Sequence, residues 1–372
     1  MSITTRAAVC RAGGQPWEIT ELELDEPRVN EVLIKFHAAG LCHSDDHIQK
    51  GDAPMRMPVV GGHEGAGVVE AVGEAVTRVA VGDHVTCSFI PACGSCRYCA
   101  TGRQNLCDAG KNAGTGMFAD GTFRFHKDGE DYGGLCVLGT FSQYAVVSEF
   151  SVIKIPAEIP FDVAALVACG VPTGWGSAVR AGGVRAGQTV VIYGSGGVGS
   201  NAVQGASLAG AKNVIVVDPV EFKREMAAVF GATHTFATAK EAHDFVRETT
   251  WGQLADHAIM TPGAVTEEMV QAAVMMTGKG GKVTITAVGH INERAVHVHA
   301  GTLIGYHRQI RGALFGDSNP LYDIPMLLGL YKSGQLKLDE LVSRKYSLDQ
   351  VNQAYQDMND GKNIRGVIIH EH

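Results

Sequence analysis

The hydrophobic and polar positions of this chain follow different patterns in its two halves. In the first part, short apolar runs such as residues 32–36 and 67–72 alternate with Gly, Pro and Asp. This pattern is typical of strands joined by tight turns. From residue 189 onward, apolar strand-like runs alternate with amphipathic stretches that have helical spacing. Strands are expected there at residues 189–193, 213–217, 257–260 and 282–286.

Alternating strands and helices predict a parallel, doubly wound α/β sheet. After about residue 315 the pattern changes again, to a Pro-containing helix at residues 323–333 and a strand-like segment at residues 366–370. We expect this tail to rejoin the first domain. The predicted organisation is therefore a β-rich domain of residues 1–172, completed by residues 316–372, around a doubly wound domain of residues 173–315.

Length, charge and apolar runs limit the class of protein. A chain of 372 residues exceeds the roughly 150 residues of one typical domain, so two domains are expected. The net charge of −8 gives no electrostatic reason to bind nucleic acid or an anionic membrane surface. No apolar run approaches the roughly 20 residues that span a bilayer. With no apolar leader in residues 1–6, we expect a cytoplasmic protein.

Four cysteines form a compact motif, in the order Cys93, Cys96, Cys99 and Cys107. This spacing, with glycines nearby to allow tight turns, lets four thiolates converge on one tetrahedral ion and predicts a structural zinc site. A disulfide cluster, an iron-sulfur site and small buried thiols are the alternatives. The odd total of nine cysteines and the expected reducing compartment disfavour disulfides, so iron-sulfur is the main remaining alternative.

A glycine-rich turn follows the strand at residues 189–193. Its Gly194, Gly196 and Gly199 stand in G-x-G-x-x-G register, with Gly197 and Val198 inside the motif. Such a turn places a pyrophosphate at the positive N-terminus of the next helix. Asp218 ends the next strand, where its carboxylate is suited to the ribose hydroxyls of NAD and would repel the 2′-phosphate of NADP. A solvated strand-end acid is the alternative for Asp218.

Three further soft ligands, Cys42, His63 and Cys169, are scattered along the chain. Two thiolates and an imidazole suit zinc, and three protein ligands leave a fourth position for water or a substrate oxygen. Only a folded domain could bring these residues together, so their spacing is weak support. An ordinary core or surface histidine is the alternative for His63.

Together these segments resemble one known family. Residues 40–47, 62–69 and 82–83, the cysteine motif, residues 169–174 and the glycine turn occur in the order seen in zinc-dependent medium-chain alcohol dehydrogenases. The resemblance spans essentially the whole chain. It implies a GroES-like catalytic domain with a Rossmann domain inserted in it, and an active site in the cleft between them.

The resemblance also implies a mechanism. Cys42, His63 and Cys169 would hold a catalytic zinc, at which an alcohol is oxidised to an aldehyde or ketone by hydride transfer to NAD. The proton would leave through a relay of Ser44, the cofactor ribose and His47, although a surface histidine without a role is an alternative for His47. Asp45 would orient His63, and Glu64 would tune or transiently approach the metal; both acids could instead be merely solvated.

Further positions match cofactor and substrate contacts of the family. Thr173 would lie beside the nicotinamide, Lys223 would bind the ribose, and Arg365 would bind the pyrophosphate, with ordinary surface charges as the alternative for the last two. His43 stands where many relatives carry a basic residue of the pyrophosphate clamp. Phe89 matches an aromatic position of the substrate pocket and is equally compatible with a place in the core.

More narrowly, residues 89–93, 102–108, 170–179, 218–224 and 361–368 resemble the actinobacterial nicotinoprotein, or nitrosodimethylaniline-dependent, alcohol dehydrogenases. This likeness implies NAD(H) that stays bound and is reoxidised in place by an external redox acceptor, with mycofactocin as the implied candidate. Residues 112–138 resemble the long loop of dimeric relatives, and residues 310–315 resemble a strand that crosses a two-fold axis. A homodimer is expected, with a tetramer as the alternative.

Two other functions remain open at this stage. A thiol-dependent formaldehyde dehydrogenase, which oxidises S-hydroxymethyl thiol adducts, shares both zinc sites and the long loop, and its activity would require an added thiol. A noncatalytic NAD(H)-binding protein would lack zinc at the scattered ligands. The remaining cysteines, Cys10, Cys87 and Cys136, have no metal partners by motif and are expected to be small packed residues.

Overall fold

The computed structural model describes residues 2–289, 294 and 296–372. The chain divides into two compact units, a first unit of Met1–Cys169 with Asn319–His372 and a second unit of Gly170–Ser318. The predicted boundaries, after residues 172 and 315, fall three residues away from each of these. The difference arises because helix α4 (Gly170–Gly176) packs against α5 (Gly197–Leu208) and against the short helix η6 (Leu314–Asp317), which places both junctions in the second unit.

The first unit contains a closed barrel and an open sheet. The barrel follows the order β1 (Ile3–Cys10), β2 (Glu18–Leu24), β7 (Phe125–Lys127), β8 (Glu130–Gly134) and β4 (Val59–Val60). The sheet follows the order β10 (Val152–Lys154), β6 (His84–Cys87), β5 (Gly65–Val72), β3 (Glu31–Gly40), β18 (Arg365–Ile369) and β17 (Val342–Tyr346), and β9 (Tyr144–Ser148) also pairs with β3. Its α-helices are α1 (His43–Lys50), α2 (Arg97–Ala100), α3 (Phe161–Leu166), α10 (Pro320–Lys332) and α11 (Val351–Asn359).

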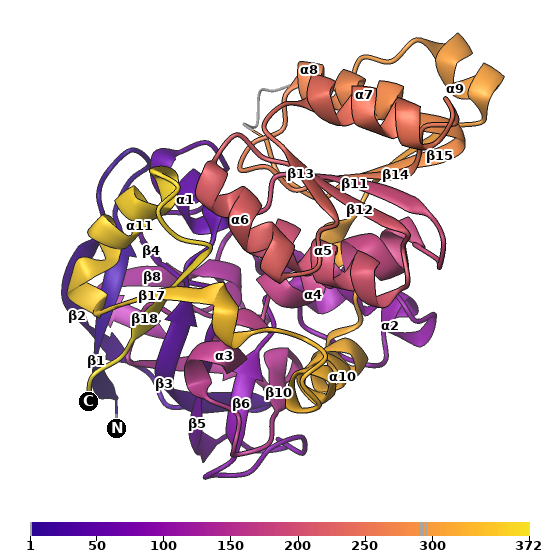
Figure 1. Cartoon of the computed structure of the whole chain (residues 1–372). Helices are drawn as coiled ribbons and strands as arrows, with labels where there is room; N and C mark the ends of the chain where they lie inside the picture. The colour runs from indigo at the N-terminus through magenta and orange to yellow at the C-terminus, as the bar shows by residue number, and fades with distance from the viewer. Residues whose placement is uncertain (1, 290–293, 295) are drawn as a thin grey trace. The chain divides into compact units, whose positions relative to one another are not determined.

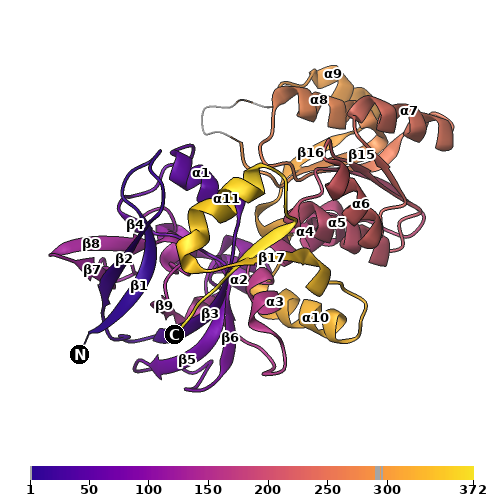
Figure 2. The same ribbon diagram turned by 60° about the vertical axis from the view of Figure 1, so that its left-hand side comes forward.

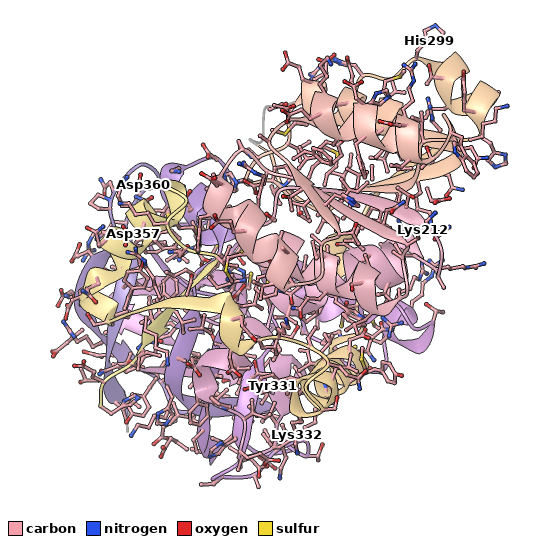
Figure 3. All side chains as sticks on the ribbon, viewed as in Figure 1. Lys212, His299, Tyr331, Lys332, Asp357 and Asp360 are labelled. Atoms are coloured by element: carbon pink, nitrogen blue, oxygen red, sulfur yellow. The ribbon has the colours of Figure 1, made fainter. Side chains whose placement is uncertain are left out.

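The C-terminal tail is part of this first unit, as the sequence predicts. Strand β18 pairs antiparallel with β3, and α11 lies beside α1 in the views of Figures 1 and 2. Figure 3 labels Asp357, which lies in the last turn of α11, and Asp360, which directly follows the helix. The nearly buried carboxylate of Asp357 accepts a hydrogen bond from Tyr346 Oη at 3.0 Å and pairs with Arg344 at 3.0 Å. These contacts fasten the helix to β17.

The second unit is a doubly wound sheet of six parallel strands, which confirms the predicted fold class. The strand order is β13 (His234–Phe236), β12 (Asn213–Val217), β11 (Thr189–Tyr193), β14 (Ala255–Met260), β15 (Thr277–Ile285) and β16 (Gln309–Gly312). Figure 1 shows α5 and α6 (Glu221–Val229) on one face, and α7 (Ala239–Thr249) and α8 (Glu267–Met276) on the other. Helix α9 (Ala300–Tyr306) precedes the edge strand. Among the described residues, no helix combines the length and apolar character needed to cross a bilayer.

The predicted strands at residues 189–193 and 213–217 coincide with β11 and β12, but other boundaries differ. Strand β15 begins at Thr277, five residues before the prediction, because Gly278 and Gly281 interrupt the apolar pattern without ending the pairing with β14. Helix α10 begins at Pro320, since proline is well tolerated in a first helical turn. Residues 112–138, expected as a loop, include β7 and β8 of the barrel.

His370, a buried histidine of the C-terminal tail, makes the stability of the folded protein depend on pH in the acid range. Burial lowers the pKa of His370 to about 4, although its hydrogen bond to the Thr140 carbonyl oxygen, at 3.0 Å from Nε2, opposes this shift. Because the unfolded chain binds this proton near pH 6.5, the folded state loses stability as the pH falls from about 6.5 towards 4.

We therefore expect His370→Gln to reduce the acid sensitivity of the protein. The full pH-dependent contribution of this histidine is on the order of 3 kcal/mol. Urea unfolding of both proteins at several pH values measures it. The difference in unfolding free energy should stay constant above pH 7 and move in favour of the variant below pH 6. A difference that stays constant down to pH 4.5 would contradict this assignment.

Candidate active site

The scattered ligands predicted from the sequence converge in the first unit. One ligand atom from each of Cys42, His63, Glu64 and Cys169 lies within 4.8 Å of all the others. Cys42 follows β3, His63 and Glu64 precede β5, and Cys169 follows α3. Because β3 and β5 are neighbours in the sheet, their ends bring the first three residues together, and the chain after α3 supplies the fourth.

Glycine at position 40 makes this convergence possible. A Cβ atom there would overlap the Oε2 atom of Glu64, and Arg365 lies directly behind it. Glu64 and Arg365 form a buried ion pair, with side chains 0% and 6% exposed. Burial raises the pKa of Glu64 to about 7, and the guanidinium of Arg365 opposes this shift. The sequence contains no local indication of this pair, because its members are 301 positions apart.

Asp45 lies beside His63, where an orienting carboxylate is expected. Its Oδ2 atom is 3.1 Å from His63 Nδ1, and its Oδ1 atom accepts the backbone N–H of Gly62 at 2.9 Å. Burial opposes a charged imidazole, but the charges of Asp45 and Cys42 raise the pKa of His63 well above its usual value. With Nδ1 directed at Asp45, Nε2 is the atom suited to bind a metal.

The two cysteines of this cluster titrate together. A hydrogen bond with Cys169 lowers the pKa of Cys42 well below its usual value, against the effect of burial, and the charge of His63 lowers it further. The same hydrogen bond, together with burial, raises the pKa of Cys169. A first thiolate is therefore stabilised in the buried cluster, as a metal ligand requires.

The proposed relay residues lie in α1, the helix that begins directly after Cys42. Ser44 Oγ lies 3.7 Å from Cys42 Sγ. His47 stands about one helical turn later in the same helix. Its Nδ1 atom is 3.0 Å from Asp52 Oδ2. Asp52 was not singled out from the sequence, although the Gly51–Asp52 pair after a helix is a recognisable C-terminal cap.

The second cluster contains the four closely spaced cysteines. Sγ atoms are 3.9 Å apart for Cys93 and Cys99 and also for Cys96 and Cys107. Tetrahedral zinc with Zn–S bonds of about 2.3 Å requires sulfur atoms about 3.8 Å apart. The cluster is therefore consistent with a structural zinc site.

Backbone N–H groups near the second cluster favour the thiolate form of two of its four cysteines. Burial opposes ionisation of Cys93, but the backbone N–H groups of Cys96 and Ser95 lower its pKa to about 6. The N–H of Cys99 likewise lowers the pKa of Cys96. Burial instead raises the pKa values of Cys99 and Cys107. A bound cation would be needed to keep all four as thiolates.

The glycine-rich turn lies in the second unit, between β11 and α5. Gly194 has φ +84°, a conformation that glycine adopts readily, and a Cβ at Gly199 would overlap the Gly194 carbonyl oxygen. A Cβ at Gly196 would meet nothing within 4 Å, so there is open space at the helix N-terminus formed by Gly197 and Val198. These features fit a dinucleotide pyrophosphate.

Asp218 also organises this turn. Its Oδ2 accepts the N–H of Ser195 at 2.8 Å, and its Oδ1 accepts the N–H of Val220 at 2.9 Å. Lys223 lies in α6, and its carbonyl oxygen accepts a hydrogen bond from Ser195 Oγ at 3.1 Å. Thr173 lies in α4, where its carbonyl oxygen accepts a hydrogen bond from Ser177. Asp218 and Lys223 therefore both contact Ser195 of the glycine-rich turn. Thr173 lies in a separate helix and contacts Ser177.

Phe89 and the three cysteines outside the two clusters lie in or beside the hydrophobic core of the first unit. Phe89 packs against the core of the first unit and also places its ring centroid 5.6 Å from that of His63, in an edge-on arrangement. Both interpretations of this residue therefore have structural support. Cys10 and Cys87 are buried in the core, while Cys136 packs beside it and is partly exposed.

Comparisons with known proteins identify the family. The model of the alcohol dehydrogenase GroES-like domain matches residues 28–157, and that of the zinc-binding dehydrogenase domain matches residues 197–331. An NDMA-dependent alcohol dehydrogenase of Amycolatopsis methanolica is 58% identical over 366 residues, which cover 98% of this chain and 99% of the relative. The chain belongs to the zinc-dependent alcohol dehydrogenases. It is an enzyme of this family, for which zinc and NAD are the implied cofactors.

Two further relatives place this enzyme within the family. An S-(hydroxymethyl)glutathione dehydrogenase of Komagataella pastoris is 36% identical over 378 residues, covering 98% of this chain and 97% of the relative. The crystal structure of a benzyl alcohol dehydrogenase from Acinetobacter calcoaceticus superimposes with a TM-score of 0.92 at 29% identity, covering 99% of this chain and 100% of that one. The resemblance to the NDMA-dependent branch is therefore much stronger than that to the glutathione-adduct branch.

Removing one ligand from each cluster should have different effects. We expect Cys96→Ala to lower the unfolding free energy by on the order of 3 kcal/mol. The reason is that residues 93–107 would lose the zinc ion that cross-links them. Cys42→Ala should remove one bound zinc and abolish alcohol oxidation with a smaller loss of stability. Zinc content by atomic emission and urea unfolding measure both effects. Equal destabilisation by the two substitutions would contradict the distinction between a structural and a catalytic site.

Proposed function

We propose that this alcohol dehydrogenase oxidises small-molecule alcohols to aldehydes or ketones with an NAD(H) that remains bound between turnovers. The observation that supports this most strongly is the 58% identity, over 98% of the chain, to an NDMA-dependent alcohol dehydrogenase. The proposal assigns two zinc ions to each chain, one at Cys42, His63 and Cys169 and one at the four-cysteine cluster. A carboxylate oxygen of Glu64 lies within 4.8 Å of the ligand atoms of these three residues.

Each group of the first cluster has a chemical task in this proposal. When bound, zinc supplies a Lewis acid and NAD supplies a hydride acceptor. Cys42, His63 and Cys169 hold the metal, and Asp45 keeps the His63 ring in the orientation that presents Nε2. Ser44 is the residue that would accept the proton of the substrate hydroxyl, and His47 is the residue that would pass a proton to solvent. The ribose of a bound cofactor would connect these two groups.

The second unit and the tail hold the cofactor. Gly194, Gly196 and Gly199 shape the pyrophosphate site, with Gly197 and Val198 at the helix N-terminus. Asp218 binds the adenosine ribose and selects NAD over NADP, assisted by Lys223. Thr173 contacts the nicotinamide, and Arg365 is the proposed partner of the pyrophosphate.

An enzyme that retains its cofactor needs a second substrate to reoxidise it in place. We assign this role to an external redox acceptor, with mycofactocin as the candidate for the physiological one. The remaining partner is a second copy of the chain, in a cytoplasmic homodimer. The proposal includes no nucleic acid and no membrane partner, in agreement with the net charge of −8.

Dye-dependent turnover tests the retained cofactor. Desalted enzyme, given primary alcohols and nitrosodimethylaniline but no added NAD, should bleach the dye for many turnovers per active site. Heat-denatured enzyme should then release NAD(H) in near-equal amounts to protein chains. Turnover that appears only after free NAD is added would return the protein to the alcohol dehydrogenases with a dissociable cofactor.

Oxidation of a thiol adduct is the second candidate function. The 36% identity to an S-(hydroxymethyl)glutathione dehydrogenase supports it, but the 58% relative is an NDMA-dependent alcohol dehydrogenase. Formaldehyde oxidation with and without added low-molecular-weight thiols separates these activities. A strict requirement for a thiol would favour the second candidate, and activity with simple alcohols alone favours the first.

A further inference from the structure

Asp52 lies just beyond the C-terminal cap of α1, and neither the sequence motifs nor the family resemblance gives this residue a role. We propose that Asp52 is a positioning residue for His47, which it holds with the proton on Nδ1 so that Nε2 accepts the proton released by the substrate. This inference rests on the relay assigned to His47 under the proposed function, and it adds the residue that prepares the histidine for that task.

The contact between the two side chains is close and partly shielded. His47 Nδ1 lies 3.0 Å from Asp52 Oδ2, and the two side chains are 12% and 26% exposed. An ionised carboxylate has acceptor atoms only, whereas a neutral imidazole has one N–H and one lone pair. Asp52 therefore selects the tautomer with Nδ1 protonated. The lone pair then lies on Nε2.

The backbone of the same segment limits how far this pair can move. Helix α1 ends at Gly51, which has φ 82° and donates its N–H to the Ile48 carbonyl oxygen at 3.0 Å. The next N–H, that of Asp52, donates to the His47 carbonyl oxygen at 2.8 Å. Asp52 thus contacts His47 twice, once through the main chain and once through its carboxylate. Glycine is favoured at position 51 because this left-handed conformation is strained for other residues.

A neighbouring turn supports the helix end from outside. The N–H of Gly14 donates to the Gln49 carbonyl oxygen at 2.7 Å, and Gln49 Nε2 donates to the Gln15 carbonyl oxygen at 2.6 Å. The backbones of Gly13 and Gly51 also approach closely, since a Cβ on Gly13 would lie 3.0 Å from Gly51 Cα. The loop between β1 and β2 therefore contacts the end of α1, mainly through backbone groups of Gly13, Gly14 and Gly51.

In this arrangement, one proton moves from the substrate hydroxyl to His47 and then to solvent. The hydroxyl of Ser44 gives its proton to the relay as it receives the proton of the substrate oxygen, and His47 Nε2 gains the transferred proton. The resulting imidazolium keeps one proton on Nδ1, where the N–H donates to Asp52 Oδ2, and the ring returns to the neutral form when Nε2 gives its proton to a solvent base. Without Asp52, no carboxylate at this position favours the Nδ1-protonated tautomer, which is the one that can accept a proton at Nε2.

A kinetic comparison separates positioning from simple stabilisation of the helix. Asp52→Ala should lower the turnover rate for alcohol oxidation by about tenfold, the lower end of the loss seen when a carboxylate that orients a metal-binding histidine is removed. The KM for the alcohol should change little. Asp52→Asn, which can still accept from Nδ1–H, should lose less. Added imidazole should restore much of the lost rate in Asp52→Ala, because a small base in solution replaces the relay.

Gln49→Ala provides the matched control. It removes the contact between the helix end and the loop at Gln15 while leaving the carboxylate of Asp52 in place. Its turnover should equal that of the unsubstituted enzyme, with or without imidazole. A similar loss in Gln49→Ala and Asp52→Ala, with no rescue by imidazole, would show that Asp52 only supports the helix end and would overturn the proposal.

A second measurement does not depend on activity. Long-range ¹H–¹⁵N spectra of ¹⁵N-histidine-labelled protein report which ring nitrogen carries the proton, and His47→Gln identifies the signals of His47. The neutral ring should carry its proton on Nδ1 in the unsubstituted protein and should become a mixture in Asp52→Ala. A neutral ring protonated on Nε2 in the unsubstituted protein would overturn the proposal. If the enzyme oxidises no alcohol at all, the proposed function fails, and these spectra alone decide whether Asp52 sets the tautomer.

Discussion

Charge balance around the buried cluster of the first unit is the constraint on which much of the structure depends. Asp45 and Glu64 are both fully buried, and two cysteines that titrate together lie beside them. A buried charge without a partner is very costly. Arg365 supplies a cation to Glu64, and His63 supplies the group that pairs with Asp45. A divalent metal on the remaining donors would complete the balance.

This constraint explains why the C-terminal tail must return to the first unit. Arg365 is the first residue of β18, and that strand pairs with β3, which leads directly to Cys42. The sheet order therefore delivers the cation to the place where the acids converge. Gly40 leaves the space that Glu64 and Arg365 occupy. The pairing of β18 with β3 and the absence of a Cβ atom at Gly40 together allow the Glu64–Arg365 ion pair to form.

Parts of the fold and site that depend on neighbouring residues could be predicted from the sequence. The four-cysteine cluster and the glycine turn are local motifs, so their spacing contains most of their geometry. The Glu64–Arg365 pair could not be found in this way, because nothing in either neighbourhood indicates the other. The start of β15 was also missed, since its first residues, Thr277-Gly-Lys-Gly-Gly, resemble a turn and are held in the sheet by pairing with β14. Asp52 is an intermediate case, local in sequence but recognisable only once the cap of α1 is known.

Helix α1 is short, yet it and its N-terminal cap carry a proposed metal ligand, the carboxylate beside His63 and both proposed relay residues. Cys42 stands at its N-terminal cap, Ser44 and Asp45 lie in its first turn, and His47 lies in its last. The helix has too few residues to be stable alone, so its position must come from tertiary contacts. Buried Asp46 pairs with Lys50 at 2.7 Å and accepts a hydrogen bond from Asn359 of α11 at 3.2 Å. The tail therefore contacts the helix that carries the proposed metal ligand and relay residues, in addition to supplying Arg365.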